Sequence, residues 1–351
     1  MYLLNNFKTR LIRTIVYQSS ILFLLILLVN KVLLANENVC IDTICNETDS
    51  QSYNNEIREI KVLVLYDDNN FFEEGWEDNL NERFIEVNNF YYSNFKIKWK
   101  ITAIQQYPFS KDIEKLSTLF SLHKEDILKL DTDAEVILSI IGRDIKGSGI
   151  AATFSKIIMV SNYDKLLSYR SSVIIAHELG HLFGAWHTQR TEDFMLVSGA
   201  SHLLAGKESS SIVKLMKNYN FAPETIINNS KVLNRISRLY ERHHARGEIN
   251  PVARLLTDYG NKYYLSKKYS KALDTLKNSI KYYGRWGKTR MLLSKTYYEL
   301  GMYSNAFTEL TRAMFFGSQP DLDYENKLKN KFIELNELDP NINNPFITRW
   351  E

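Results

Sequence analysis

The chain has 351 residues, which is enough for two domains of ordinary size. Hydrophobic residues make up 44% and charged residues 24% of it, a balance that excludes wholly disordered, collagen-like and multi-span membrane proteins. The net charge of +3 gives no general case for nucleic-acid binding, and two cysteines are too few for a disulfide scaffold.

The charge is unevenly distributed along the chain. Residues 57–200 contain 21 acidic and 16 basic side chains, whereas residues 254–317 contain 4 acidic and 12 basic ones. This difference indicates two domains with different partners, or random drift in surface charge.

Residues 1–35 have the pattern of an export signal. Lys8, Arg10 and Arg13 precede an apolar segment that is unbroken over residues 21–29, and Ala35 is a candidate cleavage position. The segment is either a cleaved signal peptide or an uncleaved membrane anchor over roughly residues 11–29, and the basic flank disfavours a buried core helix. Both export interpretations predict a secreted, periplasmic or otherwise extracytoplasmic protein.

Residues 36–56 are polar and predict a flexible linker. Cys40 and Cys45 lie in this linker, where an oxidising compartment would favour a small local disulfide. The alternative is a free thiolate that reaches a metal site and blocks it.

A structured pattern begins near residue 57 and predicts one domain over residues 57–222. Apolar runs and strict alternation predict strands over residues 60–66, 95–101, 134–141 and 157–160, the last at a sheet edge. Helical spacing of apolar residues predicts helices over residues 76–92, 112–130 and 171–183. This order predicts a mixed α/β sheet that carries one long helix.

Five residues between positions 177 and 187 form a pattern with chemical content. His177 and His181 are four residues apart, so one helical turn places both imidazoles on the same face, where they can hold one Zn²⁺. Glu178 would project beside the metal, where its carboxylate can take a proton from metal-bound water and pass it to the leaving amine. Gly184 tolerates the conformation that ends a helix, so the chain can turn back and bring His187 to the metal. The alternative, a helix that carries histidines by chance, does not explain five matching positions.

These residues match the extended zinc-binding motif of the metzincin clan of metallopeptidases. Met195 follows His187 at a distance similar to the methionine turn of matrixin-like members. The resemblance implies a Zn²⁺ held by His177, His181 and His187, with Glu178 as general base and acid. It also implies that Gly184 makes the turn, that Met195 forms an apolar floor, that residues 157–160 pair with an extended substrate, and that residues 196–204 wall a substrate pocket.

Other positions are less informative. Thr188 and Val197 depart from the residues of several subfamilies, and a tyrosine that assists the transition state in some members is absent at Val197. Asp67-Asp68-Asn69-Asn70 is either a polar turn or a set of oxygen ligands. His202 is either a solvated residue or a substrate contact.

The last third of the chain contains a repeat with a period of 34 residues. Gly260, Tyr263, Tyr269, Ala272 and Leu276 recur in kind as Ser294, Tyr297, Tyr303, Ala306 and Leu310. The period resembles that of tetratricopeptide repeats, which implies two helical units over residues 256–318 and a groove for a protein partner. Connecting helices over 223–255 and a capping helix and tail over 319–351 would complete the stack. The repeat would otherwise be purely structural, packed on the catalytic domain.

The sequence therefore predicts an α+β protein, with a metzincin-like mixed sheet and active-site helix followed by an all-α domain of tetratricopeptide-like repeats. The predicted function is a zinc-dependent endopeptidase that acts on protein or peptide substrates with one catalytic Zn²⁺. A non-catalytic zinc-binding adaptor with the same repeats is the alternative. Arg235, Arg238 and Arg242 form a helical stripe, which is either a basic surface for a partner or a solvated helix face.

Overall fold

The computed structural model describes residues 56–161, 168–319, 321–339 and 345. The predictions for residues 1–35, for Cys40 and Cys45, and for nearly all of the linker lie outside this part of the chain. Within the described residues, no helix combines the length and the apolar character needed to cross a membrane.

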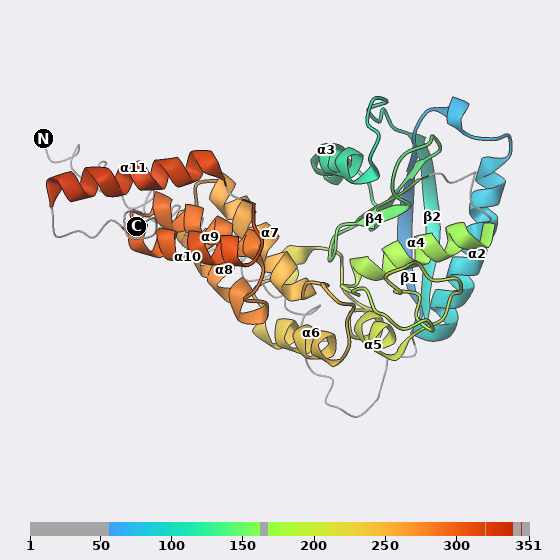
Figure 1. Ribbon diagram of the computed structural model, residues 1–351. Coiled ribbons are helices and arrows are strands. Elements are labelled where there is room, and N and C mark those ends of the chain that lie inside the picture. Colours follow the sequence, from blue (N-terminus) through green and yellow to red (C-terminus); the bar gives the residue numbers. More distant parts are fainter. Residues whose placement is uncertain (1–55, 162–167, 320, 340–344, 346–351) are drawn as a thin grey trace, which may run out of the picture. The chain divides into compact units, whose positions relative to one another are not determined.

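A five-stranded sheet forms the frame of the first half of the described chain (Figure 1). Its strands are β1 (Arg58–Tyr66), β2 (Ile97–Gln106), β3 (Val136–Ile141), β4 (Gly149–Ala151) and β5 (Ile157–Ser161), and their spatial order is β2-β1-β3-β5-β4. β2, β1, β3 and β5 run parallel to one another, and β4 is antiparallel to β5. Each predicted strand overlaps one of these strands, so the predicted mixed sheet is confirmed.

Local backbone conformation and hydrogen bonds explain two of the boundaries that differ from the prediction. The helix predicted from residue 76 is α2 (Trp76–Phe95), and it continues until Lys96 adopts a left-handed conformation with φ of 58°. The following strand therefore starts at Ile97. The helix predicted over residues 112–130 is α3 (Leu116–Leu128), because Lys146 donates its N–H to Glu114 and accepts the N–H of Leu116, which holds that segment extended.

The prediction that residues 157–160 form an edge strand is wrong. β5 lies between β3 and β4, and all five of its residues are buried, as expected of an inner strand. The strand at this edge of the sheet is β4, which spans only Gly149–Ala151, and β2 lies at the opposite edge. A three-residue strand beside Gly147 and Ser148 is too short to show any periodicity, so its sequence does not predict a strand.

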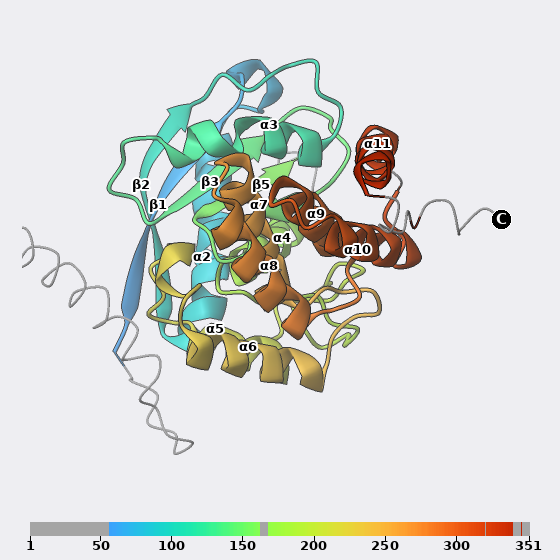
Figure 2. The ribbon, with the colours of Figure 1, turned by 90° about the vertical axis from the view of Figure 1, so that its left-hand side faces the viewer.

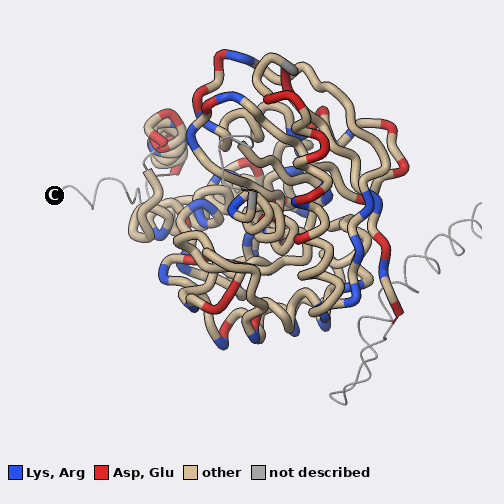
Figure 3. Tube along the Cα trace, turned by 90° about the vertical axis from the view of Figure 1, so that its right-hand side faces the viewer, with Lys and Arg blue, Asp and Glu red and all other residues tan. Residues whose placement is uncertain are grey.

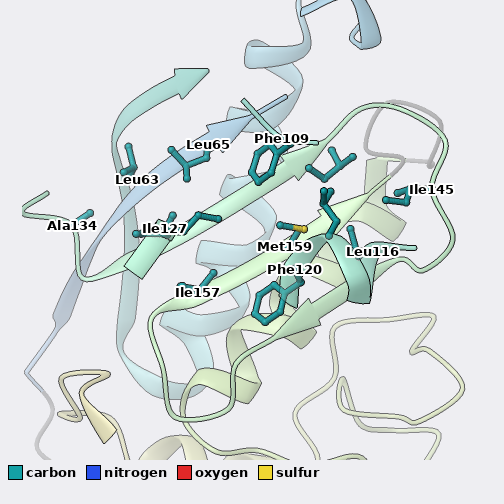
Figure 4. Packing of buried hydrophobic residues seen from close by; sticks show 13 residues of the cluster. Leu63, Leu65, Phe109, Leu116, Phe120, Ile127, Ala134, Ile145, Ile157 and Met159 are labelled. Atoms are coloured by element: carbon teal, nitrogen blue, oxygen red, sulfur yellow. The ribbon is translucent and has the colours of Figure 1, made fainter. Parts of the chain in front are cut away.

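The two faces of the sheet are covered by different helices. α3 packs on one face, where alternate residues of the strands join it in one apolar cluster (Figure 4). The strand residues of this cluster include Leu63, Leu65, Ile137, Ile157 and Met159. α2 and α4 (Ser168–Leu182) lie on the other face and contact each other, and the Tyr91 hydroxyl of α2 donates to the carbonyl of Ala176 in α4 (2.8 Å).

The second half of the described chain is helical. Its helices are α5 (Lys207–Leu215), α6 (Ser230–Arg242), α7 (Pro251–Leu265), α8 (Tyr269–Tyr282), α9 (Gly287–Glu299), α10 (Tyr303–Phe315) and α11 (Leu322–Leu338). α7 packs beside α8 and α9 beside α10 (Figure 2), and α8 also contacts α9. Each predicted repeat unit therefore contains two packed helices, while its assignment to the tetratricopeptide family stays a prediction.

Small residues of the 34-residue pattern lie where the paired helices approach. A Cβ on Gly260 would lie 2.4 Å from Cδ2 of Leu276 in the partner helix. At the corresponding position of the second unit, the Ser294 hydroxyl donates to the carbonyl of Ala306 (2.5 Å). Ala272, Leu276, Ala306 and Leu310 are all buried. The repeated residues therefore determine how closely each helix pair packs.

Charged residues of both signs are interspersed along the trace seen from the sheet side (Figure 3). Several form opposite-charge pairs, such as Arg58 with Glu135 (2.9 Å) and Lys61 with Asp133 (2.7 Å). The Lys61–Asp133 pair is exposed, and exposed pairs of this kind contribute little stability.

Replacing Gly260 by alanine would force α7 and α8 apart, because the added Cβ meets Leu276. We expect the free energy of unfolding to fall by about 1–3 kcal/mol, despite the higher helix propensity of alanine. Denaturant unfolding measures the change, and Lys262→Ala on the exposed side of α7 is the control. Equal stability of Gly260→Ala and the wild type would contradict this account of the helix contact.

Candidate metal centre

The three histidines of the predicted motif lie together. His177 and His181 are one turn apart on α4, with ring centroids 4.9 Å apart. The ring of His187 lies 4.8 Å from that of His181 and 5.2 Å from that of His177. One nitrogen from each ring lies within 4.8 Å of the other two, so the three side chains can contact a single ion.

Gly184 makes the turn that brings His187 back towards α4. Its φ is +86°, a conformation that favours glycine, and its N–H donates to the carbonyl of His181 (2.9 Å). The N–H of Ala185 then donates to the carbonyl of Gly180 (3.2 Å), which closes the helix end. A Cβ on Gly184 would also lie 2.0 Å from Cε1 of Phe154. Both the backbone conformation and the close packing therefore require glycine.

Each histidine is oriented through its Nδ1 atom. His177 Nδ1 lies 2.8 Å from the carbonyl of Phe194, and His181 Nδ1 lies 2.7 Å from the carbonyl of Ala185. His187 Nδ1 lies 2.8 Å from Oε2 of Glu248. Because these oxygens can only accept, each Nδ1 carries the proton and donates it, and each Nε2 keeps its lone pair for a metal.

The surroundings keep the rings of His177 and His181 neutral. Burial, with a smaller contribution from the neighbouring His187, lowers the pKa of His177 to about 4. Burial also holds the pKa of His181 well below its usual value. Neutral imidazole is the form that binds metals, so the donor set fits Zn²⁺, which prefers nitrogen ligands.

Met195 lies beneath this helix and is fully buried. A Cβ on Gly180 of α4 would lie 2.7 Å from its sulfur, so the helix and the methionine turn touch. The turn is fixed by Asp193, whose carboxylate accepts the N–H of Met195 (2.9 Å) and the hydroxyl of Ser209 (2.8 Å). Thr188, next to His187, donates its N–H to the carbonyl of Met195 (2.8 Å).

Glu178 lies between α4 and the edge strand. Glu178 is only 6% exposed. A Cβ on Gly149 of β4 would lie 2.4 Å from Oε1 of Glu178. Burial raises the pKa of Glu178 to about 8. The absence of a side chain at Gly149 therefore leaves room for this carboxylate at the sheet edge.

Two cavities meet at Gly149 and Glu178. One, of about 470 Å³, extends past Ser148 and is lined by His177, the first turns of α4 and residues 196–201. The other, of about 150 Å³, extends past Ala151 and is lined by His181, His187 and the segment from Glu248 to Arg254. The histidines and Glu178 therefore lie at the middle of a cleft that follows β4.

Other candidate residues lie elsewhere. His202 is exposed, one residue beyond the part of the chain that lines the larger cavity. Asp68 accepts the N–H of Asn70 (3.1 Å) and the ammonium of Lys111 (2.8 Å), which favours the polar-turn interpretation of residues 67–70. Arg238 and Arg242 are exposed on α6, and Arg235 is half-buried.

Sequence reasoning missed Glu248 and Arg254 as neighbours of the site. Both lie far along the chain from the histidines, in or beside the segment between α6 and α7. No spacing rule connects a glutamate with a histidine 61 residues earlier, so only the fold brings them together.

Neither a protein-family model nor a curated protein matches the sequence. Among solved structures, the chain is similar to an archaemetzincin from Methanopyrus kandleri at 15% identity and a TM-score of 0.34, covering 49% of this chain and 98% of that one. It is similar to metalloproteinase-II from Bacteroides fragilis at 13% identity and a TM-score of 0.33, covering 51% and 60%. It is also similar to a chain of a chaperone–substrate complex at 14% identity and a TM-score of 0.36, covering 47% of this chain but only 36% of that one.

The buried carboxyl of Glu178 gives the metal-free protein a pH-dependent stability. Its pKa of about 8 exceeds the ordinary 4.5, so between these values the folded state holds a proton that the unfolded state has lost. This contribution stabilises the fold in acid and is lost as the pH rises through about 8. We expect Glu178→Gln to gain stability relative to wild type by up to about 1.4 kcal/mol for each pH unit across this window.

Denaturant unfolding of both chelator-treated proteins, at several values between about pH 5 and pH 8, measures this difference. Comparing each variant with wild type at the same pH removes the contributions of all other titrating groups. A stability difference between Glu178→Gln and wild type that stays constant with pH would contradict the raised pKa of the buried Glu178 carboxyl.

Proposed function

We propose that the chain is a zinc-dependent endopeptidase of the metzincin kind. The observation that supports this most strongly is a cluster of three imidazoles, each with its Nδ1 atom in a hydrogen bond. The cluster lies beside the buried carboxylate of Glu178 at a sheet edge. Three protein ligands leave one position for water, which is the arrangement of catalytic zinc sites.

A zinc ion held by His177, His181 and His187 would polarise the scissile carbonyl and make the attacking water more acidic. Glu178 would take the proton from that water and pass it to the leaving amine. Burial raises the pKa of Glu178 in the metal-free protein, and a carboxylate with a raised pKa is a stronger proton acceptor.

The edge strand β4 would hold the substrate. An extended peptide can add to a sheet edge through main-chain hydrogen bonds, and antiparallel pairing is the slightly stronger geometry. A peptide antiparallel to β4 would run from Ala151 towards Ser148, with its N-terminal part at the smaller cavity. The residue after the scissile bond would then enter the larger cavity of about 470 Å³.

The remaining parts of the chain have proposed roles as well. The two packed helix pairs from α7 to α10 support a tetratricopeptide-like module, which would bind a protein partner or the substrate itself. The basic and apolar pattern of residues 1–35 supports export, with an N-terminal anchor as the alternative to a cleaved signal.

Removal of the metal and removal of the Glu178 carboxylate should have different effects. A chelator should abolish cleavage of a peptide library, and added zinc should restore it. Glu178→Gln should retain zinc but lose activity by about 10²–10⁴-fold, because the proton acceptor is gone. The exposed Glu192 in the nearby turn provides the matched control, Glu192→Gln.

Mass spectrometry of the peptide products and of bound zinc measures both effects. Full activity of Glu178→Gln would contradict the mechanism. Bound zinc without turnover of any peptide would instead favour the zinc-binding adaptor.

The larger cavity predicts a preference at the residue after the scissile bond. Val173, Ile174 and Leu196 line it, so large apolar side chains should be accepted there and preferred to glycine by about tenfold or more. Ile174→Trp should shift the preference towards smaller residues, while Ile85→Trp on the exposed side of α2 should not. Library profiling of the three proteins measures this, and an unchanged preference in Ile174→Trp would contradict the assignment.

A further inference from the structure

His187 is held differently from the other two histidines of the triad. His177 and His181 lie on α4 and donate to backbone carbonyls close to the motif. His187 lies beyond the turn at Gly184, and its Nδ1 donates instead to a carboxylate oxygen, Oε2 of Glu248, at 2.8 Å. This contact comes from the segment between α6 and α7.

The Glu248 carboxylate is itself fixed in place. Its side chain is only 12% exposed, and its Oε1 faces the guanidinium of Arg254 at 3.5 Å. Its backbone N–H donates to the carbonyl of Ala245 (3.1 Å), and its own carbonyl accepts the hydroxyl of Tyr240 (2.6 Å). The residue therefore has little freedom to move away from His187.

The same segment is joined to the chain around His187 by two more hydrogen bonds. The N–H of Ala245 donates to the carbonyl of His187 (2.8 Å). The indole N–H of Trp186 donates to the carbonyl of His243 (2.8 Å). Main chain and side chain of the third histidine are thus both held by residues 243–248.

We infer that Glu248 is a positioning residue for the metal centre. Its carboxylate accepts the Nδ1 proton of His187, which selects the tautomer, fixes the ring rotation and makes Nε2 a stronger donor to the metal. The inference rests on the proposed zinc function. It means that the region after residue 222 completes the metal centre rather than only binding partners.

Two variants separate the parts of this role. Glu248→Gln keeps an oxygen that can accept from His187 but removes the charge, whereas Glu248→Ala removes both. A positioning role predicts that zinc affinity falls in the order wild type, Glu248→Gln, Glu248→Ala. Glu241→Ala removes an exposed carboxylate from the neighbouring α6 and is the matched control.

Zinc affinity of the full chain is measured by competition with a chromophoric chelator, and the visible spectrum of the cobalt-substituted protein reports the ligand geometry. We expect Glu248→Ala to bind zinc about 10–100-fold more weakly and to shift the cobalt spectrum. Glu248→Gln should show a smaller loss of affinity, and Glu241→Ala should match wild type.

Wild-type affinity and an unchanged cobalt spectrum in both Glu248 variants would overturn the inference, even if their thermal stability fell. If Glu248→Ala does not fold, the Glu248→Gln result decides by itself. Failure of the wild type to bind zinc, or binding that survives His181→Ala, would instead overturn the proposed zinc function. The two failures are therefore distinguishable.

Discussion

Three imidazoles can share one ion only if each ring is held at the correct rotation, and in this fold their Nδ1 hydrogen bonds provide that restraint. The acceptors are the carbonyls of Phe194 and Ala185 and the carboxylate of Glu248. Each acceptor depends on a different piece of structure: the methionine turn, the end of α4 and the segment before α7. A shift in any of these pieces would rotate one of the three rings, so the histidine triad couples regions that are distant in sequence.

The approximate positions of β1, β2, β3 and β5 along the chain and the clustering of the three histidines could be predicted from the sequence, because both depend on local spacing. Helical spacing places His177 and His181 on one face, and glycine at position 184 permits the reversal. The edge strand β4 could not be predicted, because it has only three residues and its pairing with β5 depends on tertiary contacts rather than on local sequence. Glu248 could not be predicted either, because its contact with His187 depends on the packing of α6 and α7.

The identity of the edge strand matters for the proposed peptide hydrolysis. With β5 at the edge, a substrate would lie against a strand whose residues are in fact all buried. With β4 at the edge, Gly149 lies against the carboxylate of Glu178, and the two cavities meet at that point. One small residue therefore allows the sheet edge, the Glu178 carboxylate and the cleft to share a single location. A larger residue at position 149 would occupy the space of the carboxylate.

The hydrogen bonds between residues 186–187 and 243–248 also bear on how the chain is divided. A boundary at residue 222, chosen from sequence pattern alone, separates His187 from the carboxylate that orients it. The charge difference between residues 57–200 and 254–317 fits either two domains with different partners or random drift in surface charge, and it carries no information about buried contacts. Ala245 donates its backbone N–H to the carbonyl of His187, and the carbonyl of His243 accepts the indole N–H of Trp186. Because residues 243–248 contribute backbone groups to both bonds, substitutions of their side chains leave this part of the connection intact. The Glu248 carboxylate is the part of the connection that contacts the His187 ring directly, and it lies in the region that the sequence pattern predicted only as connecting helices.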